Sequence, residues 1–545
     1  MHQAQKKMIP SSTKLAKTIL GVFSLGFILW SSGFIHMTSF VAIDGRRYFC
    51  LFDDAMISMR YAWNFSHGSG IVWNPGEYVQ GYTNFLMVIL MSIATFFFDK
   101  SSAVLALQIL GIAILLGIAV ANMEIGKRIF ASKDHQHREL FDILCFVGAL
   151  AYYPLVFWSL MGMETGLVTL LILLSVLAAL NYCANKNRAD IIQLGIYTGL
   201  AFLARNDSIL LVFPIWLYIL WEIWKSKNNR RAFSDFAAAG ALFSVIAIGL
   251  LAFQYFYYGE ILPNTYALKM TGMPLLFRIR NGIGFIIPFL IEMALLVGLP
   301  ILDLFLNFRK GKLLLFSMFI SATGYQIYVG GDPWDYWRML APSVPLLIML
   351  FVYAAFDFVD YLSNLRLNGF ARKKYIAPTL ITTLTLFGLI SANMRFWPEI
   401  SFATKPYQTE GNQIAVNTSI AINQLLTENS TVGVFWAGSI PYFTEKHAVD
   451  FLGKSDRYIA HLPADVSGSI SWSGMQSVPG HNKYDLDYSI KTLLPTYVQN
   501  LKWGNQNVRS WAKTKYIEIE YQGVSLILLR GSPDVLWSKL ENPEL

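Results

Sequence analysis

Residues 53–86 read DDAMISMRYAWNFSHGSGIVWNPGEYVQGYTNFL, and this polar stretch lies between long apolar runs. Apolar residues at its start recur at three- and four-residue spacing, which predicts a short helix. Asp53 and Asp54 would open this helix, where the amide dipoles favour negative charge. Glycines, Asn74 and Pro75 then break the chain repeatedly. Because nothing in the stretch could cross a bilayer, we expect it to hold a carboxylate pair at the membrane surface.

The composition of the whole chain indicates an α-helical polytopic membrane protein. Of 545 residues, 54% are hydrophobic and only 14% are charged. The formal charge of +8 would also suit nucleic-acid binding, but Lys and Arg gather in short clusters between apolar runs, as orientation in a membrane requires. We therefore expect a lipid bilayer and no nucleic acid as partner. Cys50, Cys145 and Cys183 are too scattered for a disulfide framework or a zinc site.

Twelve apolar runs are candidate membrane spans: 16–36, 84–98, 103–122, 141–160, 163–182, 191–204, 208–224, 236–258, 283–306, 312–329, 338–360 and 376–393. The run 84–98 falls short of the roughly 20 residues that a span needs, so we expect eleven crossings. The basic clusters are 127–138, 186–188, 225–231, 309–312 and 366–374. From 141 onward they fall on every second connection between the apolar runs. This alternation predicts a cytoplasmic N-terminus and puts the 37–84 loop and the C-terminal region outside the cell membrane.

The chain changes character after Asn393, where the long apolar runs stop. Three short stretches there are typical of strands: Thr431–Trp436, Tyr516–Tyr521 and Val524–Leu529. We therefore predict two domains. Residues 1–394 form the transmembrane domain, whose exterior loop 37–84 carries the carboxylates, and residues 395–545 form a soluble extracytoplasmic α/β domain.

Two of the exterior segments have residues suited to chemistry on a phosphate-linked substrate. Adjacent carboxylates can act as acid and base: we favour Asp53 as the base and Asp54 as an orienting group, with a divalent cation at the pair as a further candidate. A simple helix start is the alternative interpretation. Arg338 ends the segment GGDPWDYWR, and its planar guanidinium suits a phosphate, although an interfacial anchor would also lie there.

Together these segments resemble the GT-C glycosyltransferases, and they are similar to the mycobacterial terminal arabinofuranosyltransferase. The matching segments keep their order over about residues 50–485: DDAMISMRYAWN, GSGIVWNPGEYVQGYTN, MGMETGL, LARND, GEILPNTYALK, GGDPWDYWRMLAPSVPLL, AGSIPYF, VDFLGKSDRYIAH and PGHNK. Two departures concern the sugar specificity: Arg205-Asn206-Asp207 replaces an Arg-Pro-Glu type of sequence, and Gln80 stands where we expect a glutamate.

The resemblance implies an inverting glycosyltransferase in the cytoplasmic (inner) membrane. Its donor would be a polyprenyl-phosphate-linked sugar, and its acceptor a cell-envelope glycan or glycolipid on the outer side. Such a donor needs cations for its phosphate, and the candidates are Arg338, Lys269, Arg60 and Arg205. The candidate substrate-binding residues are Glu164, Asp207, Asn264, Asp332, His481, Tyr82 and Asn84. No nucleotide-binding motif is required, and the sequence contains none.

The main alternative is a transporter or flippase for a lipid-linked or anionic solute. It predicts charged groups at mid-membrane depth and a repeat between halves, whereas the carboxylates here cluster in predicted exterior loops and no repeat is visible. A membrane acyltransferase would need a histidine in or beside a span, and the histidines lie at edges, in loops or in the C-terminal region. The sequence leaves open the sugar, the acceptor, the metal requirement and the oligomeric state.

Overall fold

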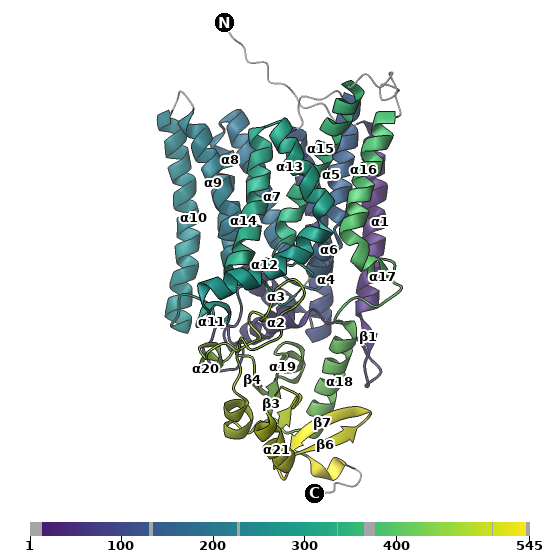
Figure 1. The fold of residues 1–545 in the computed structure, drawn as a ribbon. Helices are drawn as coiled ribbons and strands as arrows, with labels where there is room; N and C mark the ends of the chain where they lie inside the picture. The colour runs from purple at the N-terminus through teal and green to yellow at the C-terminus, as the bar shows by residue number, and fades with distance from the viewer. Residues whose placement is uncertain are drawn as a thin grey trace.

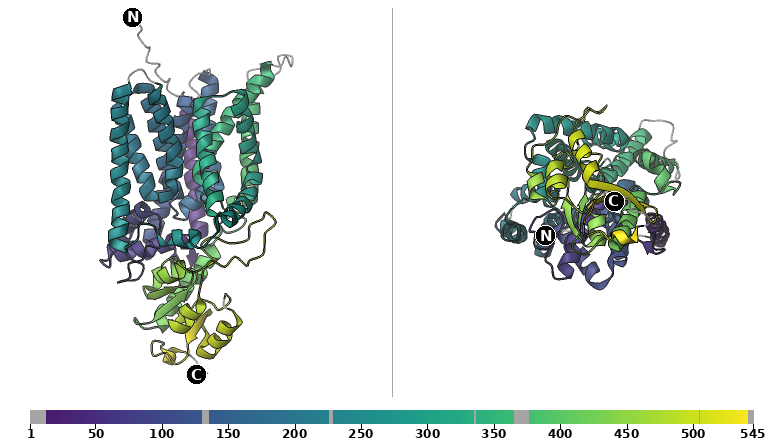
Figure 2. Two further views of the ribbon diagram at one scale, coloured as in Figure 1. Left: turned by 60° about the vertical axis from the view of Figure 1, so that its left-hand side comes forward. Right: turned by 90° about the horizontal axis from the view of Figure 1, so that it is seen from below.

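A long helical bundle carries a smaller C-terminal domain at one end (Figures 1 and 2). The computed structural model describes residues 13–129, 135–225, 229–334, 336–364, 376–503 and 505–540. The basic cluster 366–374, Lys133, Lys227 and Asp335 lie outside the described residues. The bundle begins with α1 (Lys14–Thr38) and ends with α16 (Ile376–Asn393), and the chain then enters the C-terminal domain.

Seven described helical segments are long and apolar enough to cross a membrane: Lys14–Thr38, Lys100–Ile129, Thr165–Asn185, Asn206–Trp224, Arg230–Tyr258, Ala341–Leu362 and Ile376–Ile400. They correspond to α1, α4, α7, η1 (Asn206–Ser208) with α9 (Ile209–Trp224), α10 (Asn229–Tyr258), η2 (Ala341–Ser343) with α15 (Val344–Asn364), and α16 with η4 (Met394–Phe396) and α17 (Trp397–Ile400). Two bent pairs raise the count to nine at most: α5 (His135–Ala151) with α6 (Tyr153–Leu160) at 56°, and α11 (Asn264–Met270) with α12 (Leu275–Glu292) at 95°. The chain is therefore a multi-pass membrane protein.

The expected eleven crossings are not reproduced by helix length and composition. The predicted run 283–306 breaks at Met293, which separates α12 from the 13-residue α13 (Ala294–Leu306). The run 191–204 forms α8 (Arg188–Ala204), which has 17 residues. Both α8 and α14 (Lys310–Val329) nevertheless lie alongside the longer helices in Figure 1.

The prediction that 84–98 does not cross the membrane agrees with the structure. These residues form α3 (Phe85–Phe97), a helix of 13 residues. At 1.5 Å per residue it is about 20 Å long, shorter than the hydrocarbon core of about 30 Å. It packs beside α2 (Asp53–Ser66) at the end of the bundle that carries the C-terminal domain (Figure 1).

The basic clusters gather at the opposite end of the bundle. Lys127 and Arg128 lie in the last turn of α4, Lys186 follows α7, and α14 begins at Lys310. These helix ends lie far from the C-terminal domain (Figure 1). The described members of these basic clusters therefore share one side of the membrane domain, and α2 shares the other side with the C-terminal domain, as the charge alternation predicts.

The C-terminal domain contains a mixed five-stranded sheet. Its order is β4-β3-β5-β7-β6, with β3 parallel to β4 and β5, and β7 antiparallel to β5 and β6. The strands are β3 (Thr431–Val434), β4 (His447–Asp450), β5 (Tyr497–Val498), β6 (Tyr516–Tyr521) and β7 (Val524–Leu529). The helices of this domain are α18 (Thr409–Leu425), α19 (Ser439–Thr444), α20 (Arg457–Ala460) and α21 (Gln506–Lys515). The predicted strands at 516–521 and 524–529 are confirmed, and the one at 431–436 ends two residues earlier.

Hydrogen bonds to backbone groups fasten this domain to α2 and to the loop that follows it. Asn74 exchanges two hydrogen bonds with the Ala448 backbone, with Nδ2 donating at 2.9 Å and Oδ1 accepting at 3.1 Å. Trp73 Nε1 donates to the Ala437 carbonyl at 3.2 Å. The polar stretch 53–86 therefore contacts the C-terminal domain directly and holds it against the bundle.

Arg60 belongs to this attachment, which corrects its assignment as a phosphate ligand. Its Nε donates to the Trp73 carbonyl at 3.0 Å and its Nη2 to the Glu445 carbonyl at 3.1 Å. The side chain is only 1% exposed and lies outside the large cavity described below. The sequence predicts Arg60 as a free cation because the backbone carbonyls that bind it belong to the distant C-terminal domain.

Candidate active site

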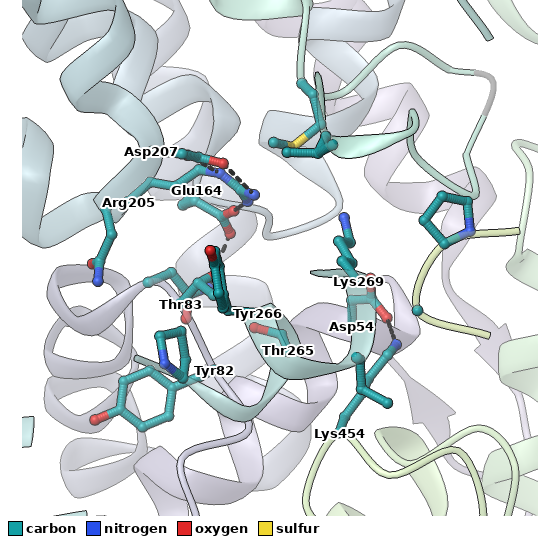
Figure 3. A pocket seen from close by; sticks show the side chains of 18 of the residues that line it. Asp54, Tyr82, Thr83, Glu164, Arg205, Asp207, Thr265, Tyr266, Lys269 and Lys454 are labelled. Atoms are coloured by element: carbon teal, nitrogen blue, oxygen red, sulfur yellow. Dashed lines mark hydrogen bonds and ion pairs between the residues drawn. The ribbon is translucent and has the colours of Figure 1, made fainter. Parts of the chain in front are cut away.

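A cavity of about 500 Å³ lies where the bundle meets the C-terminal domain. We call it the charged cavity. Its apolar walls include Ile57, Phe202, Leu210 and Leu251. Its acidic, basic and histidine lining residues are Asp54, Glu164, Arg205, Asp207, Lys269, Arg338, Lys454 and His481. Figure 3 shows two charged groups on either side of Thr83, Thr265 and Tyr266.

Arg338 is the centre of the first charged group, and it joins two carboxylates. Its Nε and Nη2 donate to the two oxygens of Asp332 at 2.9 and 3.1 Å, and its Nη1 donates to Asp54 Oδ2 at 2.6 Å. A guanidinium has five N–H groups, so two of them stay available for a ligand. Burial would raise the pKa of Asp332, but Arg338 and then Lys269 outweigh it and lower that pKa to about 2. Asp332 thus anchors Arg338 as a permanent anion.

Two lysines complete this first group. Lys269 Nζ donates to Asp332 Oδ1 at 3.0 Å, and Lys454 Nζ pairs with Asp54 Oδ1. Burial would raise the pKa of Asp54, but Lys454 and Arg338 outweigh burial and hold that pKa well below its ordinary value. Asp54 is therefore a carboxylate held between two cations. Each lysine has one carboxylate partner among the described residues, so each keeps donors for an anionic ligand.

Arg205 is the centre of the second charged group, and carboxylates surround it more closely. Its Nε and Nη2 donate to the oxygens of Asp207 at 2.6 and 3.1 Å, and its Nη1 pairs with Glu164 Oε1. Asn84 Nδ2 donates to the other oxygen of Glu164 at 2.9 Å. This network connects the start of α7, the end of α8, the short helix at Asn206–Ser208 and the polar stretch. Arg205 has less free charge to offer a phosphate than Lys269 or Lys454.

His481 contributes a neutral imidazole to the cavity. It is 9% exposed, and neither ring nitrogen makes a hydrogen bond of good geometry to the described residues. Burial and then Lys454 lower the pKa of His481 to about 3, although Asp54 and the Pro479 backbone oppose the shift. A neutral imidazole has one donor and one acceptor nitrogen, so His481 can hydrogen-bond a polar ligand.

Asn264 and Tyr82 make hydrogen bonds to other residues of the protein near the charged cavity. Asn264 Nδ2 donates to the Gly453 and Asp456 carbonyls at 2.8 and 3.0 Å, which holds the turn that carries Lys454. The Tyr82 hydroxyl lies 3.0 Å from that of Tyr258. Asn264 is absent from the cavity lining, whereas Tyr82 lines it with its ring.

Asp53 faces away from the charged cavity, unlike its neighbour. Its Oδ1 accepts from the Ser439 N–H at 3.1 Å and its Oδ2 from the Gly438 N–H at 3.2 Å. A Cβ on Gly438 would lie 2.0 Å from the Asp53 carbonyl oxygen, so only glycine permits this contact. Burial raises the pKa of Asp53 to about 6, although Lys454 and then the Ser439 N–H oppose the rise. The expectation that both carboxylates line one site is therefore wrong.

The arrangement does not suit a divalent cation shared by Asp53 and Asp54. The two side chains line different cavities, and the oxygens of Asp54 already pair with Arg338 and Lys454. The described residues contain no group of three or more His, Cys, Asp and Glu side chains that could hold a metal ion. Hard cations such as Mg²⁺ need several oxygen ligands around one point, which this pair does not provide.

Lys454 is the residue of this site that sequence reasoning missed. It stands in the segment VDFLGKSDRYIAH, which belongs to the family pattern but does not by itself indicate a role for its lysine. It lies 400 positions from Asp54 in the chain, so only the docked C-terminal domain brings the two together. A Cβ on Gly81 would lie 2.8 Å from the Lys454 carbonyl oxygen, so a glycine in the 53–86 stretch also allows this approach.

Solved structures similar to this chain include those of ArnT and of an archaeal oligosaccharyltransferase. ArnT from Cupriavidus metallidurans in the apo state is 14% identical with a TM-score of 0.61, over 97% of this chain and 100% of that chain. ArnT from the same organism bound to undecaprenyl phosphate is 12% identical with a TM-score of 0.56, over 95% and 98%. Archaeal oligosaccharyltransferase AglB from Archaeoglobus fulgidus, in complex with an inhibitory peptide and a dolichol-phosphate, is 11% identical with a TM-score of 0.51, over 95% and 74%.

These similarities show that the chain has the GT-C fold, as its sequence predicts. A family model described as a domain of unknown function (DUF8728) matches residues 399–532. That match lies within the C-terminal domain and contains all five strands of its sheet. No curated protein matches the sequence of this chain.

Proposed function

We propose that this protein is an inverting glycosyltransferase that takes a sugar from a polyprenyl-phosphate donor. The observation that carries the proposal is the charged cavity, where apolar walls surround Arg338, Lys269 and Lys454 at the end of the membrane domain. A lipid-linked phosphate needs this combination, because its tail requires apolar surface and its phosphate requires cations. The titles of the similar ArnT and AglB structures name undecaprenyl phosphate and dolichol-phosphate, which supports the same class of donor here.

The donor phosphate would bind between Arg338 and the two lysines. Arg338 keeps two N–H groups free, and Lys269 and Lys454 each have one carboxylate partner among the described residues. Charge develops on the phosphate as the bond to the sugar breaks, and cations already in place stabilise that charge without rearrangement. His481 lies in the same wall and can donate one hydrogen bond to the leaving group.

The base for the acceptor is Asp53 rather than Asp54 in this proposal. Inversion requires the acceptor hydroxyl to attack on the side of the sugar opposite the phosphate. Asp54 pairs with the cations that would hold the phosphate, so it lies on the leaving-group side. Its lowered pKa also makes it a weak base, whereas burial raises the pKa of Asp53 to about 6, closer to the working pH.

The proposed reaction forms one bond and breaks one. The acceptor oxygen bonds to the anomeric carbon as the bond from that carbon to the phosphate oxygen breaks. The acceptor proton passes to Asp53, and the bonding electrons leave with the polyprenyl phosphate. The two oxygens of Asp53 each accept one backbone hydrogen bond and keep a lone pair for this proton.

The transporter alternative fits the cavity less well. The described charged groups of the cavity come from α2, the start of α7, α11, the segments after α8 and α14, and the C-terminal domain, all at one end of the bundle (Figure 1). A carrier would need charged groups at mid-membrane depth along a path. The charged cavity is placed to process a lipid headgroup at the surface.

The same proposal puts the C-terminal domain outside the cytoplasmic membrane and the basic helix ends inside. An impermeant thiol reagent applied to cells with an opened outer barrier would then label a cysteine at Ser467 and leave one at Arg188 unlabelled. Both positions are exposed and lie on opposite sides of the bundle. The reverse labelling pattern would contradict this orientation.

The experiment that tests the function is glycan profiling of a deletion strain. Envelope glycans and polyprenyl-phosphate sugars are compared by mass spectrometry among wild type, deletion, and deletion complemented with the gene. We expect one sugar to be missing from a glycan and its lipid-linked donor to accumulate. The sequence resemblance makes arabinofuranose the first sugar to examine. Unchanged glycans and donors in the deletion strain would overturn the proposal.

A further inference from the structure

A second cavity lies on the other side of α2, within the C-terminal domain. We call it the polar cavity. Its volume is about 300 Å³, and Asp53 forms part of its wall. Its polar lining side chains are amides, hydroxyls and an indole, and they include Gln408, Asn412, Gln499, Asn500, Thr418 and Trp436. No Lys or Arg is among its described lining residues. These walls suit a neutral ligand with many hydroxyl groups and do not suit an anion.

Two lining residues have properties that packing does not explain. Asn412 is 1% exposed, its Nδ2 donates to the Leu51 carbonyl at 2.8 Å, and its Oδ1 has no hydrogen-bond partner among the described residues. A buried acceptor without a partner is costly unless a ligand or water completes it. Gln408 adopts a left-handed backbone conformation with φ of 73°, which glycine adopts more easily. A glutamine in this strained backbone conformation, where glycine would be more stable, indicates a role for the side-chain amide.

Aromatic rings meet at the place where the polar cavity approaches the charged cavity. The Trp436 ring lines the polar cavity, and its centroid lies 6.0 Å from that of His481, which lines the charged cavity. Trp334 packs against both rings, at 6.3 Å from Trp436 and 5.8 Å from His481. The adjacent carboxylates at the start of α2 therefore face one cavity each, and a ligand in the polar cavity would lie beside Asp53.

We propose that the polar cavity is the binding site for the saccharide acceptor, an inference that rests on the proposed transfer function. The amides of Gln408, Asn412 and Asn500 would hydrogen-bond sugar hydroxyls, and Trp436 would cover one face of a sugar ring. The acceptor hydroxyl would then point at Asp53, while the donor phosphate occupies the charged cavity. The acceptor is a neutral glycan, and it enters through the C-terminal domain rather than through the lipid.

Two variants change residues that line the polar cavity and do not line the charged cavity. Gln408→Gly removes the amide and also relieves the left-handed backbone, so a merely structural role predicts equal or higher stability. Trp436→Ala removes the ring, which is 36% exposed. Trp511→Ala is the matched control, because Trp511 is partly buried on α21 of the same domain and lines neither cavity.

The probes are the labelled saccharide fraction from the envelope of a deletion strain, and undecaprenyl phosphate. Full-length protein in nanodiscs is tested for glycan retention and for the thermal shift that undecaprenyl phosphate produces. We expect Gln408→Gly and Trp436→Ala each to weaken glycan binding on the order of tenfold, with an unchanged lipid-phosphate shift. Trp511→Ala should match wild type in both.

The outcomes separate this inference from the function on which it rests. Wild-type glycan retention in both variants, with an intact lipid-phosphate shift, would overturn the acceptor site and leave the transfer function standing. No thermal shift by undecaprenyl phosphate in wild type would overturn the proposed donor itself. Weaker glycan binding in Gln408→Gly together with normal or raised thermal stability would support the site and contradict a structural explanation.

Discussion

The charged cavity and the polar cavity meet at the first turn of α2 and differ in what their walls offer a ligand. Arg338, Lys269 and Lys454 surround a carboxylate in the first, while amides and an indole surround a carboxylate in the second. Adjacent residues thus obtain opposite properties, since cations lower the pKa of Asp54 and burial raises that of Asp53. The surroundings of each aspartate, more than its residue type, determine its proposed role: Asp54 is an ion-pair partner and Asp53 is the base.

The largest expected effect is that of Asp53→Asn. Loss of a general base should lower kcat by about 10²- to 10⁴-fold. The amide also presents an NH₂ group to one of the two backbone N–H donors, so some loss of thermal stability is expected. Turnover and melting temperature of the purified variant measure the two effects separately. Asp99→Asn, an exposed carboxylate at the start of α4, is the control. Near wild-type turnover in Asp53→Asn would refute the base assignment.

Arg338→Lys should have the next largest effect. It changes the charged cavity, where the donor phosphate would bind. A lysine cannot donate to both oxygens of Asp332 and to Asp54 while presenting N–H groups to a phosphate. We expect a loss of about 2–4 kcal/mol in transition-state stabilisation, or roughly 30- to 1000-fold in kcat/KM. Turnover with a short-chain polyprenyl-phosphate sugar measures it.

The control for this arginine is Arg395→Lys, which changes an arginine that is 38% exposed and outside the charged cavity. Its activity should stay close to that of wild type. If Arg338→Lys matched it, Arg338 would be an interfacial anchor, and the phosphate site would have to rest on Lys269 and Lys454 alone.

Lys454→Gln should have the smallest effect of the three. It removes one cation from the phosphate site, a charge-assisted contact of about 1.4 kcal/mol or about tenfold in kcat/KM. It also releases Asp54 from one partner, so the loss should appear mainly with the lipid-phosphate donor. Lys446→Gln removes another buried lysine of the same domain outside both cavities. An equal loss in that control would indicate destabilisation instead of a lost phosphate contact.

Local pattern predicted the elements well where a single stretch of sequence decides them. The helix beginning at Asp53, the short helix at 85–97 and the strands β6 and β7 follow from spacing and alternation within a few residues. The breaks inside apolar runs were harder. The chain bends between α5 and α6 next to Pro154, yet the run 141–160 reads as continuous because proline alone does not stop an apolar pattern.

The site was predicted only as a set of residue types. Arg338, Lys269 and Asp332 were candidates, and the structure brings them together, but their partners come from distant segments. Lys454 lies in the C-terminal domain, and its pairing with Asp54 depends on how that domain docks. Arg60 was misassigned for the same reason, since backbone carbonyls of residues 445 and 446 bind it. Sequence patterns do not report which distant segment fills a neighbouring space.

The opposite orientations of Asp53 and Asp54 show most clearly that local sequence does not report the surroundings of a side chain. Two neighbouring residues in a first helical turn diverge by about 100° around the axis, so they must face different surroundings. The sequence does not say which surroundings those are. Only the contact of Gly438 and Ser439 with Asp53 assigns one carboxylate to the polar cavity and leaves the other with the cations.

The pH dependence of kcat/KM with the lipid-phosphate donor tests the central claim most directly. Ionised Asp53 is the active form in this account, so kcat/KM should fall as pH drops through its pKa of about 6. The same acid limb should persist in Asp54→Asn at a lower plateau, because the base is unchanged. The account predicts this limb near pH 6 in the wild type and at a lower pH in Asp54→Asn, because the charge of Asp54 helps to raise the pKa of Asp53. A wild-type profile that stays flat down to pH 4 would contradict it and make Asp54, whose pKa is lowered, the base.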